Sequence, residues 1–152
     1  MSRVSAPVLA CLLVALAGSA TGCGEGGISA GAVVTVYVEA PLCQGARHQL
    51  KQTNGGVGEV EVRAVCLPAV ESRDRLDLAT AGENARSASE DSTAVAYLGP
   101  PGPAAKFTGP VLDAAEIAVL RGGDVGEEMG KVLDALRDAE ADPRDAVFDT
   151  LG

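Results

Sequence analysis

The sequence has a single histidine, His48, and few basic residues. Zinc sites are built mainly from several cysteine and histidine side chains, so one histidine without a free cysteine pair argues against a zinc site. Without Arg3, the only charged residue of the first 22, 11 basic residues stand against 21 acidic ones, a net charge of −10. That charge repels nucleic acid and anionic lipid, so we expect no nucleic-acid partner and a domain that stands off the membrane surface.

Glycine motifs that bind phosphate are also missing. Gly55–Gly58 precedes the second expected strand instead of following the first, and it lacks the third glycine of a dinucleotide fingerprint. Gly130-Lys131 has neither the upstream glycine nor the following Ser or Thr of a phosphate loop. The acidic pairs Glu90-Asp91 and Glu127-Glu128 project in different directions from a helix, which is typical of solvated surface. The sequence therefore predicts neither an enzyme nor a cofactor.

Residues 1–22 have the composition of an export signal. Their apolar run, Val8–Ala17, has ten residues, whereas a membrane-spanning helix needs about 20. The string Ala20-Thr21-Gly22-Cys23 resembles the lipobox of bacterial lipoproteins, in which the cysteine is lipidated and becomes the first mature residue. The alternative is ordinary signal cleavage near Ala20, with Cys23 left as a stray thiol.

Residues 23–31 begin with the lipidation candidate Cys23 and continue as a glycine-rich tether without apolar periodicity. A flexible coil of this composition reaches about 15 Å. Residues 32–152 are long enough for one domain with a core of its own. We therefore expect a single domain anchored by lipid to the extracytoplasmic face of the bacterial cell membrane.

The four cysteines divide by position. Cys11 leaves with the signal and Cys23 is the lipidation candidate, so Cys43 and Cys66 remain as one pair. In an oxidising compartment such a pair normally closes, and its loop would stabilise the fold by roughly 3 to 3.5 kcal/mol. The alternative is a catalytic Cys43 with His48 as its base. Five residues on a helix place two side chains off a common face, so we expect His48 to be an ordinary polar residue.

Hydrophobic patterning predicts an α/β fold. A nearly unbroken β-branched and aromatic run predicts a buried strand at 32–38, and an apolar run predicts a second buried strand at 92–99. Residues 59–67 alternate polar and apolar before becoming apolar, which predicts an outer strand that enters the core. Helical spacing and helix-start signals predict helices at 45–53, 77–92, 110–120, 125–136 and 142–151. Alternating strands and helices imply a three-layer structure: a parallel sheet of about three strands in the order 2-1-3, flanking helices and two C-terminal helices, in a single Rossmann-like lobe.

The same topology predicts where a ligand would bind. Ligands of open parallel sheets lie at the carboxyl ends of the strands, where the strand order reverses. For the order 2-1-3 that point lies between the ends of the first and third strands, and a Cys43–Cys66 disulfide would brace the same rim. The candidate ligand-binding residues are Ala40, Pro41, Leu42, Gly99, Pro100 and Pro101.

Five stretches are to be compared with known families: VTVYVEAPLCQGA, VRAVCLP, ARSASEDSTAVAYLGPP, PVLDAAEI and MGKVLDALRDAEADPRDAVFDTL. Together they resemble the substrate-binding proteins of branched-chain amino acid ABC transporters, which have the type 1 periplasmic-binding fold. The resemblance covers about Val33–Ile117 and Val125–Leu151. The resemblance implies a solute-binding component with an amino acid or small polar solute as ligand and an ABC permease as partner.

The sequence departs from that family at two places. Family members have two lobes, whereas this chain passes from the third helix through Arg121–Asp124 directly to tail-like helices, so it predicts one lobe. Pairing of two copies as a homodimer would rebuild a cleft. Where the family offers serine hydroxyls and amides to the ligand carboxylate, Gly99–Pro103 has no hydroxyl and three prolines without amide donors. The alternative function is therefore a non-catalytic interaction or structural lipoprotein of the envelope.

Overall fold

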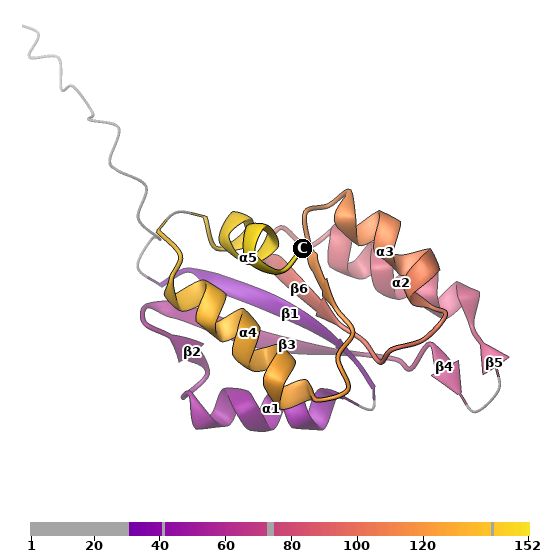
Figure 1. Cartoon of the computed structure of the whole chain (residues 1–152), viewed down its shortest axis with the longest axis horizontal. Helices are drawn as coiled ribbons and strands as arrows, with labels where there is room; N and C mark the ends of the chain where they lie inside the picture. Colours follow the sequence, from indigo (N-terminus) through magenta and orange to yellow (C-terminus); the bar gives the residue numbers. More distant parts are fainter. Residues whose placement is uncertain (1–30, 41, 73–74, 141) are drawn as a thin grey trace, which may run out of the picture.

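The computed structural model describes residues 31–40, 42–72, 75–140 and 142–152 (Figure 1). The expected signal segment, Cys23 and the tether as far as residue 30 lie outside the described residues, and so does Pro41. Among the helices within these ranges, none has the length and apolarity needed to cross a membrane.

The main sheet has five strands in the order β2-β3-β1-β6-β7. Its members are β1 (Val33–Glu39), β2 (Gly56–Val57), β3 (Val60–Leu67), β6 (Ala94–Leu98) and β7 (Ala118–Leu120). β3, β1, β6 and β7 run parallel, and the short β2 pairs antiparallel with β3 at one edge. The predicted order of the three long strands is confirmed, but the predicted number of strands was too low. A separate antiparallel pair consists of β4 (Glu71–Ser72) and β5 (Arg75–Leu76).

Helices cover both faces of the sheet, which confirms the predicted three layers (Figure 1). On one face lie α1 (Cys43–Gln52), α4 (Val125–Arg137) and α5 (Pro143–Leu151), whose buried side chains pack with those of β1, β3 and β6. On the other lie α2 (Leu78–Ser89) and α3 (Ala105–Asp113), which pack around Tyr37 and Tyr97. β1 is buried along six of its seven residues, as its unbroken apolar run predicts.

The helix predicted over 110–120 is confirmed only for residues 110–113, because a helix that begins earlier and a strand share this range. α3 begins at Ala105 with Pro110 in its interior, not in its first turn, and it ends at Asp113. Glu116 then takes a left-handed conformation, φ 55°, and the amide of Ile117 bonds to the Leu112 carbonyl in a helix-ending turn. The next three residues form β7 on the open side of β6. Only residues 114–117 separate α3 from this three-residue strand, and the apolar residues there continue the helical spacing, which explains the error.

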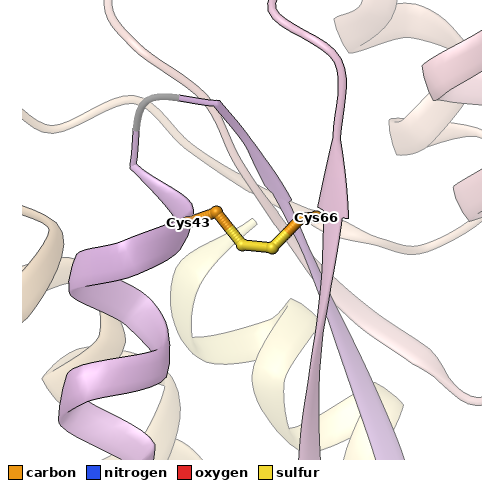
Figure 2. Close-up of a disulfide and its surroundings, with 2 residues drawn as sticks. All are labelled: Cys43 and Cys66. Atoms are coloured by element: carbon orange, nitrogen blue, oxygen red, sulfur yellow. A yellow bond between two sulfur atoms is a disulfide. The ribbon is translucent and has the colours of Figure 1, made fainter.

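The disulfide between Cys43 and Cys66 is present, with the two Cα atoms 5.6 Å apart (Figure 2). It joins the first residue of α1 to the second-to-last residue of β3, near the carboxyl edge of the sheet. Because the Cys43 sulfur is bonded, the alternative of a free Cys43 nucleophile finds no support. His48 is exposed on α1, and its Nε2 lies 3.1 Å from Nε2 of Gln52.

Replacing Glu116 by glycine is expected to stabilise the protein by about 1 kcal/mol, because glycine adopts the left-handed conformation without steric penalty. Chemical denaturation of wild type and Glu116→Gly measures the difference. Glu83→Gly, at an exposed position inside α2, is the matched control and should destabilise by about 0.5–1 kcal/mol. A loss of stability in Glu116→Gly would contradict the assigned backbone conformation.

Candidate functional site

The predicted ligand-binding residues that the structure describes, all but Pro41, lie at the carboxyl edge of the sheet, where the strand order reverses. β1 and β6 are parallel neighbours with Val38 opposite Leu98, so Ala40 and Gly99 leave the sheet at the same end. The Ala40 amide donates to the Leu67 carbonyl at 3.0 Å and is therefore already used.

Other members of that predicted set have mainly structural positions. Leu42 is the residue before α1 and packs against the core. Gly99 is buried and its amide donates to the Leu120 carbonyl at 3.1 Å. Pro100 is half-buried and Pro101 is exposed. The backbone of this edge is thus largely occupied, and its chemistry comes from side chains outside the predicted set.

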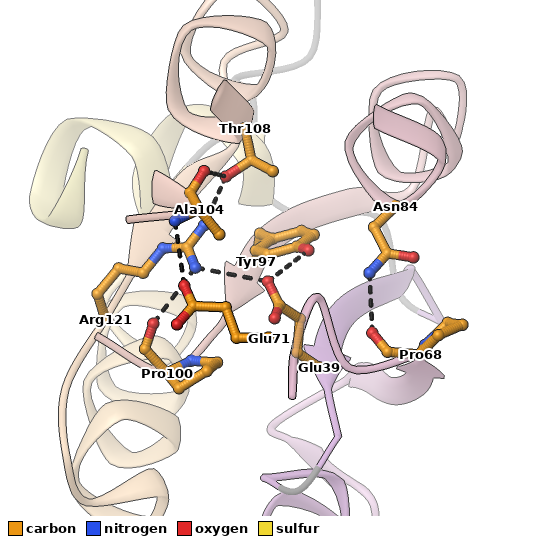
Figure 3. A network of polar contacts seen from close by, with 9 residues as sticks. All are labelled: Glu39, Pro68, Glu71, Asn84, Tyr97, Pro100, Ala104, Thr108 and Arg121. Carbon is orange, nitrogen blue, oxygen red and sulfur yellow. Dashed lines mark hydrogen bonds and ion pairs between the residues drawn. The ribbon is translucent and has the colours of Figure 1, made fainter. Parts of the chain in front are cut away.

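Three side chains meet at this edge: Glu39, Tyr97 and Arg121 (Figure 3). Glu39 ends β1 and is fully buried. The Tyr97 hydroxyl donates to Glu39 Oε1 at 2.8 Å, and Arg121 Nη1 lies 3.4 Å from the same oxygen. The Arg121 guanidinium also lies over the Tyr97 ring, 5.5 Å from its centroid. We call Glu39, Tyr97 and Arg121 the switch-point cluster.

Arg121 is held from α3 and from the loop after β6. Its Nη2 donates to Thr108 Oγ1 at 2.6 Å, and its Nη1 contacts the Pro100 carbonyl at 3.4 Å. The Arg121 side chain is 14% exposed, whereas that of Glu39 is 1% exposed. Arg121 is therefore the member of the ion pair that faces solvent.

Gly99 allows the loop after β6 to pass directly over the ion pair. A Cβ atom at this position would lie 2.5 Å from Arg121 Nη1 and 2.8 Å from Glu39 Oε1, closer than real contacts allow. The charged groups of the cluster therefore occupy the point of strand-order reversal, where open parallel sheets usually bind their ligands.

The cluster has one acceptor and one donor left over. Within the described part of the chain, Glu39 Oε2 and Arg121 Nε are buried and have no hydrogen-bond partner. Buried polar atoms in folded proteins are almost always paired, because desolvation without a hydrogen bond is costly. The cluster therefore keeps a free acceptor on its anion, Glu39, and a free donor on its cation, Arg121, at the strand-order reversal.

The environment also affects Tyr97. Burial raises the pKa of Tyr97 well above its ordinary value, and the hydrogen bond to Glu39 and its negative charge raise this pKa further. The tyrosine therefore remains a donor toward Glu39 at physiological pH. Among the residues that the structure describes, no group of three His, Cys, Asp or Glu side chains gathers in a way that could hold a metal ion.

Sequence reasoning located this edge but missed the residues of the cluster. A local signal existed for Glu39, a single acidic residue that closes an otherwise apolar strand. No such signal existed for Arg121, because the strand before it was taken as the end of a helix. Glu39 and Arg121 are 82 residues apart in sequence, so only the fold brings them together.

No protein-family model matches this chain, and neither a curated protein nor a solved structure matches it.

Both tyrosines are expected to resist ionisation in the folded protein. The pKa of Tyr37 is raised to about 12, first by burial and then by the hydrogen bond to Asp91 and its charge. Since the folded state holds these protons more tightly than the unfolded chain, stability should fall as the pH rises above about 10.

Ultraviolet titration of tyrosinate measures this directly, because the chain has two tyrosines and no tryptophan. The folded protein should show almost no tyrosinate at a pH of about 10, where the denatured chain is half ionised. In Tyr97→Phe, the remaining transition should belong to Tyr37, near 12. A tyrosine that titrates at its ordinary pKa in the folded wild type would contradict the hydrogen bonds described.

Proposed function

We propose that this protein is a lipid-anchored lipoprotein of the extracytoplasmic face of the bacterial cell membrane. Its single Rossmann-like lobe binds a small polar solute at the switch-point cluster, without catalysis. The observation that carries this proposal is the pair of unpartnered atoms, Glu39 Oε2 and Arg121 Nε, at the point where strand order reverses.

Two features support the location. The segment 1–22 and the string Ala20-Thr21-Gly22-Cys23 have the pattern of a lipoprotein signal. The Cys43–Cys66 disulfide fits an oxidising compartment outside the cytoplasm.

The charges of the cluster favour a solute that offers both a donor and an acceptor. Glu39 Oε2 would accept from an ammonium or amide N–H, and Arg121 Nε would donate to a carboxylate or carbonyl. An amino acid has both groups and is the ligand class implied by the resemblance to branched-chain amino acid ABC transporters, with an ABC permease as partner. Arg121 covers Glu39 and is held by Thr108 at 2.6 Å and by contacts of 3.4 Å to Glu39 and Pro100, so a solute would have to displace this side chain to reach Glu39.

The alternative is an interaction or structural domain of the envelope with a lobe that binds no solute. The observation favouring it is the close approach of Gly99 to the ion pair, with Glu39 fully buried beneath it. In that case the unpartnered atoms are part of a rigid polar core, and the partner is a protein, a second copy of the chain included.

A thermal-shift panel of amino acids and other small polar solutes separates the two functions. A ligand at about a hundred times its dissociation constant adds about 2.7 kcal/mol, a rise of several degrees in Tm. Glu39→Gln should weaken binding at least about tenfold, because a hydrogen bond to a charged group contributes about 1.5–3 kcal/mol.

Glu61→Gln is the matched control, since Glu61 lies exposed on β3 and pairs with Arg63. Its affinity should equal that of wild type by calorimetry. A cooperative melt that no solute moves would reject the binding function in favour of the interaction domain. Equal weakening by both substitutions would place the solute elsewhere.

The anchor is tested by mass spectrometry of the chain isolated from bacterial membranes. The expected mature N-terminus is Cys23 carrying two or three acyl chains. Cys23→Ala should release the protein from the membrane fraction, because the lipid is its attachment. An unmodified N-terminus at another residue would contradict the lipoprotein assignment.

A further inference from the structure

β7 is the outermost strand of the main sheet on the side opposite β2, so one of its sides pairs with β6 and the other side is open. Across the boundary between β6 and β7, the Gly99 amide donates to the Leu120 carbonyl at 3.1 Å. Successive residues of a strand direct their backbone polar groups to opposite sides, so the amide and the carbonyl of Val119 point toward the open side. β7 therefore offers a hydrogen-bond donor and an acceptor to an additional strand.

A groove of about 420 Å³ lies at this open side. Its walls come from both helical layers, with α3 from one face of the sheet and α5 from the other (Figure 1). We call it the β7 groove and define it by Pro110, Asp113, Ile117, Val119 and Phe148. An open strand edge between two walls is the geometry in which an extended peptide adds to a sheet.

The β7 groove is apolar apart from Asp113, the one lining residue with a charged side chain. Apolar surface continues from the groove onto α3, where Phe107 is 52% exposed and Val111 is 44% exposed. Phe107 is three positions before Pro110 and four before Val111, so it adjoins both on the surface of the helix. Apolar surface that is rimmed by polar residues is typical of a protein interaction site.

The charge around the β7 groove is negative. Asp113 is exposed, and so are Glu116 and Asp149, each of which adjoins a lining residue in sequence. The basic residue of α3, Lys106, lies seven positions before Asp113, about 10 Å along the helix. A second copy of the chain would bring the same acidic groups to the groove, and like charges would oppose this pairing. A segment with basic residues is attracted instead.

We propose that the β7 groove binds an extended segment of another protein, apolar at its centre and basic at its ends, which adds to the sheet as a strand beside β7. The apolar centre fills the groove between α3 and α5, and its backbone bonds to the amide and carbonyl of Val119. The basic ends pair with Asp113 and the acidic residues beside it. This surface is a second binding function, and the proposal does not rest on solute binding.

The probe for this surface is a synthetic peptide with three central valines and two lysines at each end. Titrated into the purified full chain, it should bind saturably and slow hydrogen exchange of the Val119 amide, as measured by NMR. At 90% saturation the rate should fall about tenfold, because only the unbound tenth of the molecules exchanges. The Leu120 amide faces β6, so its exchange should change much less.

Two modified peptides separate strand addition from attraction between charges. N-methylation of the three valines removes their amide donors and keeps the charge, so it should weaken binding about fivefold or more. A peptide with glutamates in place of the lysines should also bind about fivefold more weakly or worse, because its ends face the acidic rim.

Asp113→Lys reverses the charge at the groove and should weaken binding of the lysine peptide about threefold or more. Glu83→Lys makes the same change of charge at an exposed position of α2 that does not line the groove, so it is the matched control and should weaken binding much less. Both residues are exposed on helices, so neither substitution is expected to unfold the protein.

Unchanged exchange at Val119, or equal binding of the N-methylated and unmodified peptides, would overturn the proposal, because no strand would have been added. Equal weakening by Asp113→Lys and Glu83→Lys would also overturn it, as general attraction of a cation to an acidic protein. Sedimentation of the free chain checks the remaining occupant. A dimer that the peptide dissociates would assign the groove to a second copy of the chain and overturn the proposal, and no such dimer is expected.

Discussion

The burial of one negative charge, Glu39, constrains much of this structure. A carboxylate that is removed from water destabilises the fold unless cationic and hydrogen-bonding partners surround it. The strand that carries Glu39 is the centre of the sheet, with β3 on one side and β6 on the other. Its partners come from the same side of the sheet: Tyr97 lies in the neighbouring strand β6, and Arg121 directly follows β7, the next strand beyond it.

The same requirement explains the composition of the surrounding segments. The loop after β6 begins with a glycine because any larger side chain would meet the guanidinium and the carboxylate. On the face that holds Tyr97, α2 contributes Ala85 and Ala88 to the apolar cluster, and these small side chains leave room for the two tyrosine rings. The glycine above the ion pair and the alanines beside the tyrosine rings thus both make room for the side chains that surround Glu39.

The sequence was most informative where a signal is local. The β-branched run predicts β1, and the apolar run at 92–99 predicts β6. The cysteine count predicts the pair Cys43 and Cys66. Asp142-Pro143 predicts the start of α5, where Asp142 does accept from the Arg144 amide. The short strand β7 and the two-residue strands β2, β4 and β5 were not predicted, because too few residues carry a period of two. Alternation over two or three positions cannot be distinguished from part of a helical pattern.

The candidate site shows the same division. Topology rules place it at the reversal of strand order, and the residues leaving β1 and β6 are found there. Its chemical groups could not be assigned from the sequence, since Tyr97 and Arg121 are 58 and 82 residues away from Glu39 along the chain. Their meeting depends on the register of three parallel strands, which is set by packing against both helical layers.

The disulfide cross-links elements on one side of the central strand β1, and no cross-link of this kind is described on the other side. Cys43 and Cys66 close a covalent loop that contains α1, β2 and most of β3, on the β3 side of the central strand. β6 and β7 lie outside this loop and pair with it through β1, and the register between β1 and β6 is interrupted at Thr35 and Val36. The ion pair from Glu39 to Arg121 crosses the boundary between β1 and β6. A molecule that binds at that ion pair would therefore contact both sides of this boundary and hold them together.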